Sequence, residues 1–496
     1  MEHPARLDVT GWRKQALLPV LIYSAMVMSV LSTLGSPMIP TIAQAQHVSL
    51  EAAQWVLTIT LLIGAVATPI TGRLADGPYR KMTILASLGF VLIGSMLAAL
   101  APHFALLMVG RAMQGFGLGL VPLAISVARD CLPVDKVRSG IAILSVSTAA
   151  GTGLGYPITG LIAEQFDYHA AFWFAGIISL IALVMVWLVV PSGSLRPAHA
   201  LDLPGAALLS VALLALLLCI SQGQKWGWGS GRIVGLALVT VVFGAIWILQ
   251  ALRAKHPLVD LRVMTNRTVL TADIVALMMG VSLYAMTSLL NRYVQAPAEA
   301  GYGFHAGLLA TGLMLAPLSI GSLLSTRTSN FLTSRFGPNL VLPIGAAIVS
   351  LDMVYVALSR GNRWEIVVAM IVLGLGISTT FAAMPLLIIR SVPPSETGSA
   401  TSMNTLLRSV GGSIGSAASI ALLSTYTPVG ATLPTDHGYT ITFLAGAAVC
   451  GASAIVAILM LPRKPADGGQ PAPAREPERP SLGTSATPEP RAALEA

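Results

Sequence analysis

Ionisable side chains stand at a few positions inside long apolar stretches of this sequence, where they are rare and costly. The acids are Asp273 and Asp352, and the bases are Arg111 and Arg408. A charge at the centre of a bilayer costs about 2.5 kcal/mol or more, so such residues are functional candidates by default. Burial raises the pKa of a carboxyl and a nearby cation lowers it, so a carboxyl that moves between these environments can carry a proton. We expect Asp273, which is close to Arg408 in depth, to form a titratable pair with it, and Asp352 to be a second, weaker candidate.

Each of these residues has an alternative interpretation. Asp273 and Arg408 would also be explained by a static buried ion pair or by a hydrated position near the membrane surface. Arg111 needs a partner or water if it is buried, and it could instead extend its long side chain to the outer interface.

Aromatic, methionine and amide side chains in the same stretches could line a cavity for apolar solutes. Methionine is flexible and polarisable, which suits a surface that accepts many ligands. The candidates for the substrate cavity are Tyr23, Met26, Gln114, Tyr156, Tyr284, Phe381 and Asn404. Residues of these types also pack between helices or face lipid, and that alternative stays open for each of them.

Other kinds of site find no support in the sequence. The three cysteines, Cys131, Cys219 and Cys450, have no metal-ligand spacing, and no histidine cluster has it either. No phosphate-binding GxxxxGK[ST] loop and no Ser–His–Asp arrangement can be recognised. We therefore expect no metal, no cofactor and no enzymatic reaction, and transport driven by ATP hydrolysis in this chain is not supported. The net charge of +8 concerns membrane orientation and does not indicate nucleic-acid binding.

The elements that must position these residues are membrane-spanning helices. Of the 496 residues 55% are hydrophobic and 10% are charged, whereas about 25% are charged in a soluble protein. A run of about 20 apolar residues crosses a bilayer, and such a run must be helical because lipid offers the backbone no hydrogen-bond partners. The sequence predicts an all-α membrane protein with fourteen spans, at 17–39, 54–73, 82–101, 105–127, 139–162, 170–190, 203–222, 232–252, 268–290, 305–325, 339–358, 365–388, 398–423 and 439–461.

The distribution of positive charge predicts the orientation of these spans. With an even number of spans both termini lie on one side, and 19 lysines and arginines up to and including Lys464 fall there, against 5 on the other side. Because basic loops stay in the cytoplasm, we expect both termini to be cytoplasmic and the protein to lie in the cytoplasmic membrane. Near the opposite ends of the spans stand Trp226, Trp228 and Trp364.

Three stretches combine small, charged and turn-forming residues at regular spacing. The loop after the second span reads Gly72-Arg-Leu-Ala-Asp76-Gly-Pro-Tyr-Arg80-Lys81, which places a carboxylate at a helix end close to cations. The fourth span contains Arg111-Ala-Met-Gln114-Gly-Phe-Gly-Leu-Gly. The fifth contains Gly151-Thr-Gly-Leu-Gly155-Tyr156-Pro157-Ile-Thr-Gly160, where glycines four residues apart allow close helix packing and proline adds a bend.

In order and spacing these stretches resemble motifs of the major facilitator superfamily. Two further stretches are similar to its fourteen-helix drug:proton antiporter branch, namely Gln54-Trp55-Val56 and Asn404-Thr-Leu-Leu-Arg408-Ser-Val-Gly411-Gly412-Ser-Ile-Gly415. The resemblance implies a conformational latch at Gly72, Asp76 and Arg80, and a part in proton coupling for Arg111. It also implies that the fifth span is the antiporter-motif helix, with Gly151, Gly155, Pro157 and Gly160.

The same resemblance implies a domain organisation. It predicts two six-helix bundles, 17–190 and 268–461, with two inserted transmembrane helices, 203–252, between them. A degenerate repeat of the 72–81 loop occurs at Leu332-Thr-Ser334-Arg335-Phe-Gly337, and internal repeats of this kind indicate that a transporter consists of two related halves. Residues 1–16 are predicted to be a cytoplasmic N-terminus, and the Pro-, Ala- and Glu-rich residues 464–496 a disordered cytoplasmic tail.

The resemblance implies proton-coupled efflux of amphipathic or hydrophobic small molecules by alternating access. We expect the partners to be a small-molecule substrate and the lipid bilayer, with no nucleic acid, and the protein to act as a monomer. One departure is that Leu31 stands where the antiporter branch usually has an aspartate in its first span. The alternative is therefore a dedicated exporter of one endogenous metabolite or lipid. A membrane-embedded enzyme or receptor is disfavoured, since no catalytic constellation or soluble domain is apparent.

Overall fold

The computed structural model describes residues 11–34, 38–192, 202–255, 257–393, 396–428 and 433–461. Within these ranges every regular element is helical, and fourteen helical segments are long and apolar enough to cross a membrane. The prediction of an all-α membrane protein with fourteen spans is confirmed. The predicted tail at 464–496 lies outside the described residues, as do residues 1–10 of the predicted N-terminal segment. The first helix begins at Trp12, after Gly11 with a positive φ of 65°.

The first six spans form an N-terminal half. The fourth span is built from three segments, because its glycines let a short 3-10 turn interrupt the α-helix where other helices approach it closely. A Cβ at Gly117 would meet the Met28 side chain, and one at Gly119 would meet Thr71. The elements of this half are α1 (Trp12–Thr33), α2 (Ile39–Ala45), α3 (Leu50–Ala75), α4 (Arg80–Ala99), α5 (Phe104–Gly115), η1 (Phe116–Gly119), α6 (Leu120–Cys131), α7 (Val134–Gln165) and α8 (Tyr168–Val189).

The last six spans form a C-terminal half with the same number of crossings. Its second span is divided at Pro317, because proline lacks the N–H that would continue the helix. The elements are α12 (Arg267–Val294), η2 (Ala298–Ala300), α13 (Leu308–Leu315), α14 (Pro317–Phe336), α15 (Pro338–Leu358), α16 (Arg363–Ser391), α17 (Thr397–Thr425) and α18 (Asp436–Met460). The buried apolar side chains fall into two clusters, one confined to α1–α8 and the other centred on this half.

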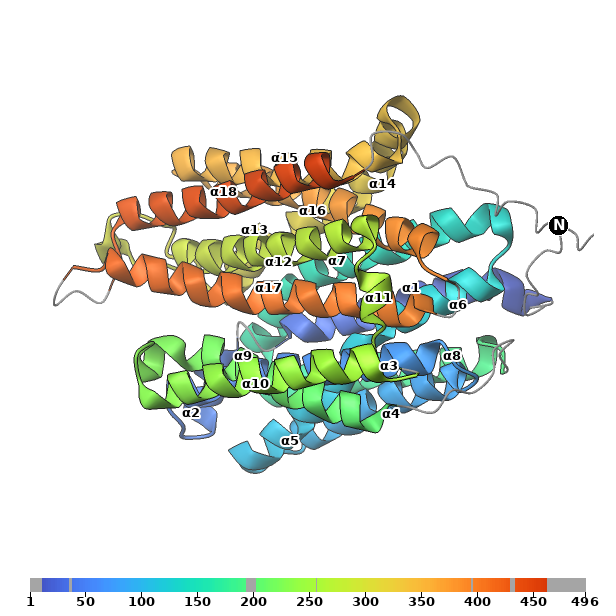
Figure 1. Cartoon of the computed structure of the whole chain (residues 1–496). Coiled ribbons are helices and arrows are strands. Elements are labelled where there is room, and N and C mark those ends of the chain that lie inside the picture. Colours follow the sequence, from blue (N-terminus) through green and yellow to red (C-terminus); the bar gives the residue numbers. More distant parts are fainter. Residues whose placement is uncertain are drawn as a thin grey trace, which may run out of the picture.

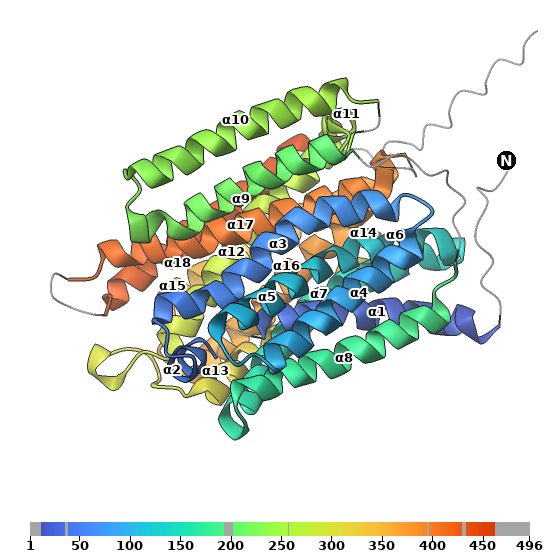
Figure 2. The same ribbon diagram turned by 90° about the horizontal axis from the view of Figure 1, so that it is seen from below.

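The two inserted helices, α9 (Leu203–Trp226) and α10 (Gly231–Arg253), form an outer layer beside the two halves (Figure 2). Helix α9 packs on both α3 and α17, whereas α10 packs mainly on α9 and turns most of its apolar side chains outward. The carboxylate of Asp202 joins this pair, because it accepts hydrogen bonds from Gly205 N at 2.9 Å and Gln250 Nε2 at 2.8 Å. The short helix α11 (Leu261–Met264) then leads into α12.

Successive spans run in opposite directions, so the connections gather at two faces of the molecule (Figure 1). We name them the Asp76 face, which carries the α3–α4 turn, and the Trp364 face at the opposite ends of the helices. Helix α1 starts and α18 ends at the Asp76 face.

Within the C-terminal half the closest packing joins α12 and α17. A Cβ at Gly280 would meet the Arg408 carbonyl oxygen, and Cβ atoms at Gly411 and Gly415 would meet carbonyl oxygens of α12. Because three glycines spread along the pair leave backbone against backbone, the depth of the residues on α12 relative to those on α17 is fixed.

We expect Gly411→Val to destabilise the protein by about 1–3 kcal/mol, since the added carbons must push α12 and α17 apart. Gly235→Val is the matched control, because Gly235 lies on α10 with open space around its Cα. Thermal unfolding of the purified protein in detergent measures the effect. Equal unfolding midpoints for the two variants would contradict the close contact.

Candidate functional site

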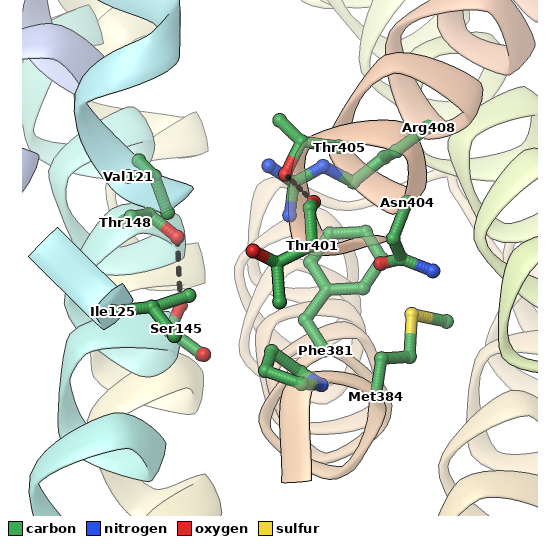
Figure 3. A pocket seen from close by; sticks show the side chains of 11 residues that line it. Val121, Ile125, Ser145, Thr148, Phe381, Met384, Thr401, Asn404, Thr405 and Arg408 are labelled. Atoms are coloured by element: carbon green, nitrogen blue, oxygen red, sulfur yellow. Dashed lines mark hydrogen bonds between the residues drawn. The ribbon is translucent and has the colours of Figure 1, made fainter. Parts of the chain in front are cut away.

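A cavity lies between the two halves, on the side of the Asp76 face. Helices α6 and α7 form one wall, and α16 and α17 form the other, so each half contributes two helices (Figure 3). The lining residues are Val121, Ile125, Ser145 and Thr148 from the N-terminal half, and Phe381, Met384, Pro385, Thr401, Asn404, Thr405 and Arg408 from the C-terminal half. Of the substrate-cavity residues predicted from the sequence, it contains Phe381 and Asn404.

The only formal charge in this cavity lining belongs to Arg408. Its guanidinium lies over the ring of Phe381, with 4.6 Å between the guanidinium carbon and the ring centroid. The Arg408 side chain is partly exposed, whereas most of the residues around it are buried. This distance is that of a cation–π contact, in which the ring attracts the guanidinium.

The carboxylate of Asp273 lies directly behind this wall. Its Oδ1 accepts a hydrogen bond of 2.9 Å from Asn404 Nδ2, which also donates to the Ala272 carbonyl oxygen at 3.1 Å. Asp273 is 4% exposed. Among the described residues no ion pair joins Asp273 to Arg408, so the direct pair expected from their similar depth is absent from this conformation. Asn404 lies between them, one turn before Arg408 on α17. Because Asn404 lines the cavity and is hydrogen-bonded to Asp273, it connects the carboxylate to the cavity wall.

Arg111 is completely buried within the N-terminal half, away from the cavity. Its Nε donates to the Val56 carbonyl oxygen at 2.8 Å, and its Nη1 donates to Gln114 Oε1 at 2.7 Å. Gln114 in turn donates to Ser95 Oγ at 2.8 Å, and the guanidinium lies 5.8 Å from the centre of the Phe172 ring. Arg111 thus donates to neutral oxygens through Nε and Nη1, while its Nη2 is buried without a hydrogen-bond partner among the described residues. Gln114 belongs to this network and lies outside the cavity lining.

At the Asp76 face, α3 of the N-terminal half binds the beginning of α17. The two carboxylate oxygens of Asp76 accept hydrogen bonds from the backbone N–H groups of Gly398 at 2.7 Å and Ser399 at 2.9 Å. These N–H groups have no partner within the helix, and they carry the positive end of its dipole. Beside them, Arg73 Nη1 donates to both carboxylate oxygens of Glu396, at 3.0 and 2.9 Å.

The other predicted latch residues fall on different sides of this contact. Gly72 takes part in it, since a Cβ there would collide with the Ser402 side chain on α17. Arg80 instead stabilises the N-terminal half alone, donating to Asp130 Oδ2 at 2.6 Å. The sequence does not predict the pairing of Arg73 with Glu396, although Arg73 follows Gly72 directly in the loop motif.

On the other side of the cavity, α7 packs against α13 and α14. A Cβ at Gly153 would meet Ser319, and one at Gly160 would lie 3.1 Å from the Leu308 carbonyl oxygen. Gly151 and Gly155 face α1 of the same half instead. Pro157 lies inside α7, which continues through it to Gln165. The antiporter-motif glycines thus allow α7 to fit between α1 and the C-terminal half, so contacts between the halves lie on both sides of the cavity.

The remaining cavity candidates lie outside its lining. Tyr23 donates to the Ile178 carbonyl oxygen on α8 at 3.2 Å, and Met26 lies against Gly151. Tyr156 is close to Tyr284 on α12, which packs on Gly412 and stands near Arg408. These two tyrosines join the halves between the cavity and the Trp364 face.

The sequence did not predict the hydroxyl residues that line the cavity. Their spacing of three or four residues places each pair on one helix face, the pairs being Ser145 with Thr148 and Thr401 with Thr405.

Asp352 is separate from all these groups. It lies on α15, 3% exposed, near Cys450 of α18 and away from the cavity lining. Both of its carboxylate oxygens are buried without a hydrogen-bond partner among the described residues. A buried carboxylate anion without hydrogen-bond partners is costly in an apolar environment.

Two halves of six spans each enclose a cavity between them, and two extra helices lie outside the halves. This arrangement is that of a polytopic membrane transporter. The family model of the Major Facilitator Superfamily matches residues 21–416, and the chain belongs to this superfamily of transporters.

Several curated relatives are similar over most of the chain. An uncharacterised transporter of this type from Mycobacterium tuberculosis is 27% identical over 415 residues, which are 82% of this chain and 59% of the relative. Multidrug resistance protein 3 of Bacillus subtilis is 27% identical over 74% of this chain and 71% of its own length. The tetracenomycin C resistance and export protein of Streptomyces glaucescens is 26% identical over 84% of this chain and 77% of its own length.

A solved structure shares the fold. The crystal structure of a human organic anion transporter superposes with a TM-score of 0.59, covering 91% of this chain and 99% of the human chain at 14% sequence identity. At this identity the likeness concerns the arrangement of the helices alone.

We expect Asp76→Asn to open the Asp76 face more often, because each hydrogen bond to a charged group contributes about 1.5–3 kcal/mol. In a variant whose three cysteines are replaced by serine, Thr401→Cys reports on the cavity. Labelling of that thiol by a membrane-impermeant maleimide, applied from the side of the Asp76 face, should become about tenfold faster. Asp135→Asn is the control, because Asp135 is exposed on the same face, and its labelling rate should equal that of the parent protein. Unchanged labelling with Asp76→Asn would show that this contact does not keep the face closed.

Proposed function

We propose that the protein exports amphipathic or hydrophobic small molecules in exchange for protons, by alternating access of the cavity between its halves. The observation that carries this proposal is the position of Asn404. It lines the cavity and at the same time donates to the buried carboxylate of Asp273. One side chain thus links a group that can hold a proton to the wall that contacts the substrate.

A proton on Asp273 changes what this link can do. An ionised carboxylate only accepts hydrogen bonds, while a protonated one also carries an O–H donor. The Asn404 Nδ2 group now donates to Asp273, so protonation weakens that bond and frees the amide to turn towards the cavity. Substrate and proton then compete through Asn404, as exchange transport requires. Arg408, one turn further along α17, is positioned to respond to the same change.

Reversible contacts at the two ends support alternating access. At the Asp76 face the bonds of Asp76 to α17 and of Arg73 to Glu396 are few and charge-assisted, so a modest change of free energy can break them. On the other side the contacts of α7 with α13 and α14 are made by small residues, which allow helices to slide. Rocking of the two halves would exchange one set of contacts for the other.

The direction of transport rests on charge distribution and on relatives. The excess of lysine and arginine in the connections at the Asp76 face supports a cytoplasmic position for that face and for both termini. Relatives of similar sequence bear the names multidrug resistance protein and resistance and export protein. We infer efflux across the cytoplasmic membrane by a monomer, with Asp273 as the proton carrier in preference to Asp352. Arg111, enclosed in its own half, would act by keeping α3 and α5 in place.

A second candidate is a dedicated exporter of one metabolite or lipid. It is favoured by Leu31, which is 1% exposed and packed in the apolar core of the N-terminal half, where the antiporter branch usually has an acid. A panel of chemically unrelated compounds in the efflux assay below distinguishes the two, because a dedicated exporter would move one class only.

The coupling is tested with N-phenylnaphthylamine, an uncharged amphipathic dye, in an efflux-deficient bacterial host. Energised cells should lose the dye faster when they contain the protein, and an uncoupler should abolish the difference. Asp273→Asn should lower proton-driven efflux at least about tenfold, as expected for loss of a proton-transfer group.

Asp352→Asn serves as the matched control and should keep most of the efflux, because Asp352 lies away from the cavity. Equal membrane content of the variants is verified by immunoblotting. Export that persists with the uncoupler, or wild-type coupling in Asp273→Asn, would refute proton exchange at this residue.

A further inference from the structure

The charge of the cavity carries information about the substrate. Of its eleven lining residues one is charged, the cation Arg408, and none is acidic. Within the described part of the chain no carboxylate lies within ion-pair distance of the Arg408 guanidinium. Arg408 is only partly exposed, and a charge in such a place without a counter-ion favours a ligand that supplies the opposite charge over one that does not.

The orientation of Arg408 leaves its donors available. Phe381 lies beside the guanidinium, with 4.6 Å from the guanidinium carbon to the ring centroid. An aromatic ring supplies no carboxylate or carbonyl oxygen, so the N–H groups of the guanidinium can still form the fork that matches two oxygens of an acid group. In the close-up view the Arg408 side chain lies beside Thr405, on the wall that faces Val121 and Thr148 of the opposite half (Figure 3).

The other polar groups of the lining are already engaged. The hydroxyls of Ser145, Thr148 and Thr405 donate to backbone carbonyl oxygens of their own helices, at 2.7 to 3.0 Å. The Asn404 amide donates to Asp273, which it keeps away from Arg408. Arg408 is therefore the one strong donor that the lining offers to a ligand.

The rest of the lining is apolar and comes from both walls. Val121 and Ile125 face the cavity from α6, and Phe381, Met384 and Pro385 face it from α16. A flat or flexible apolar body fits between these walls, and methionine adapts to bodies of different shape.

We propose that the cavity binds amphipathic anions, with a carboxylate, sulfonate or phosphate group on the Arg408 guanidinium and an apolar body between α6 and α16. This proposal rests on the proposed export function and specifies its substrate class. A cationic amphiphile of the same size is repelled by Arg408, and Leu31 gives it no acid in the first span.

Direct binding tests the charge preference with a pair of probes of equal shape. Anilinonaphthalene sulfonate and its uncharged sulfonamide analogue differ in the acid group alone. Each is titrated into the purified protein in detergent, and the signal of empty micelles is subtracted. The wild-type protein should bind the sulfonate at least about tenfold more tightly than the sulfonamide, as expected for a charge-assisted hydrogen-bonded pair.

Variants assign the preference to one residue. Arg408→Gln should remove the difference between the probes by weakening the sulfonate alone, and Arg408→Lys should restore part of it. Arg363→Gln, an exposed cation at the start of α16, is the control and should leave both affinities unchanged. A wild-type protein that binds the two probes equally, or a sulfonate preference that survives Arg408→Gln in folded protein, overturns the proposal.

The test separates this inference from the function on which it rests. Binding is measured without a membrane potential or proton gradient, so it reports on the cavity alone. Anion-selective binding together with uncoupler-insensitive efflux would contradict proton exchange and leave the substrate class intact. Proton-driven efflux of uncharged dye together with equal binding of the two probes would contradict the substrate class and leave proton exchange intact.

Discussion

The structure depends on one contact, in which the carboxylate of Asp76 accepts the first free N–H groups of α17. It joins the end of a helix in one half to the beginning of a helix in the other, and it lies within a turn of the cavity residue Thr401. A carboxylate at a helix N-terminus satisfies backbone groups that lipid cannot satisfy, so the contact stabilises the approach of α3 to α17 in this conformation. It consists of few bonds and is therefore also easy to break as a unit. The close fit of Gly72 against Ser402 and the pairing of Arg73 with Glu396 depend on the same approach of α3 to α17.

Arg111 and Arg408 show how this fold separates structural from ligand-binding charge. Arg111 is surrounded by neutral oxygens and one aromatic ring inside the N-terminal half, and it binds helices together. Arg408 has an aromatic ring but no acid beside it among the described residues, and it lines the cavity between the halves. The same side chain therefore takes part in helix packing in one place and is available to a substrate in the other. The two arginines differ because Arg111 is provided with hydrogen-bond acceptors by α3 and α5, whereas Arg408 has the ring of Phe381 on α16 beside it.

The sequence was sufficient for the fold because spans of about twenty apolar residues leave a bilayer protein few alternatives. All fourteen predicted spans overlap the observed helices, and the loop of Gly72 and Asp76 could be located from its residue types. Side-chain partners were harder to predict. Depth along the helices placed Asp273 near Arg408, but only the packing of α12 on α17 shows that Asn404 takes the position between them. Similarly, Gln114 and Tyr23 have the chemistry of cavity residues, yet their helices turn them towards neighbours within the N-terminal half.

The most direct test of alternating access is a pair of distance measurements by electron paramagnetic resonance on spin-labelled protein in lipid nanodiscs. One pair of labels, at Tyr79 and Ser334, spans the two halves at the Asp76 face, and the other, at Phe166 and Glu299, spans them at the Trp364 face. All four positions are exposed. The account predicts that acidification, which protonates the coupling carboxylate, changes the two distances in opposite directions. Distances that change together, or that stay fixed at every pH, would contradict it.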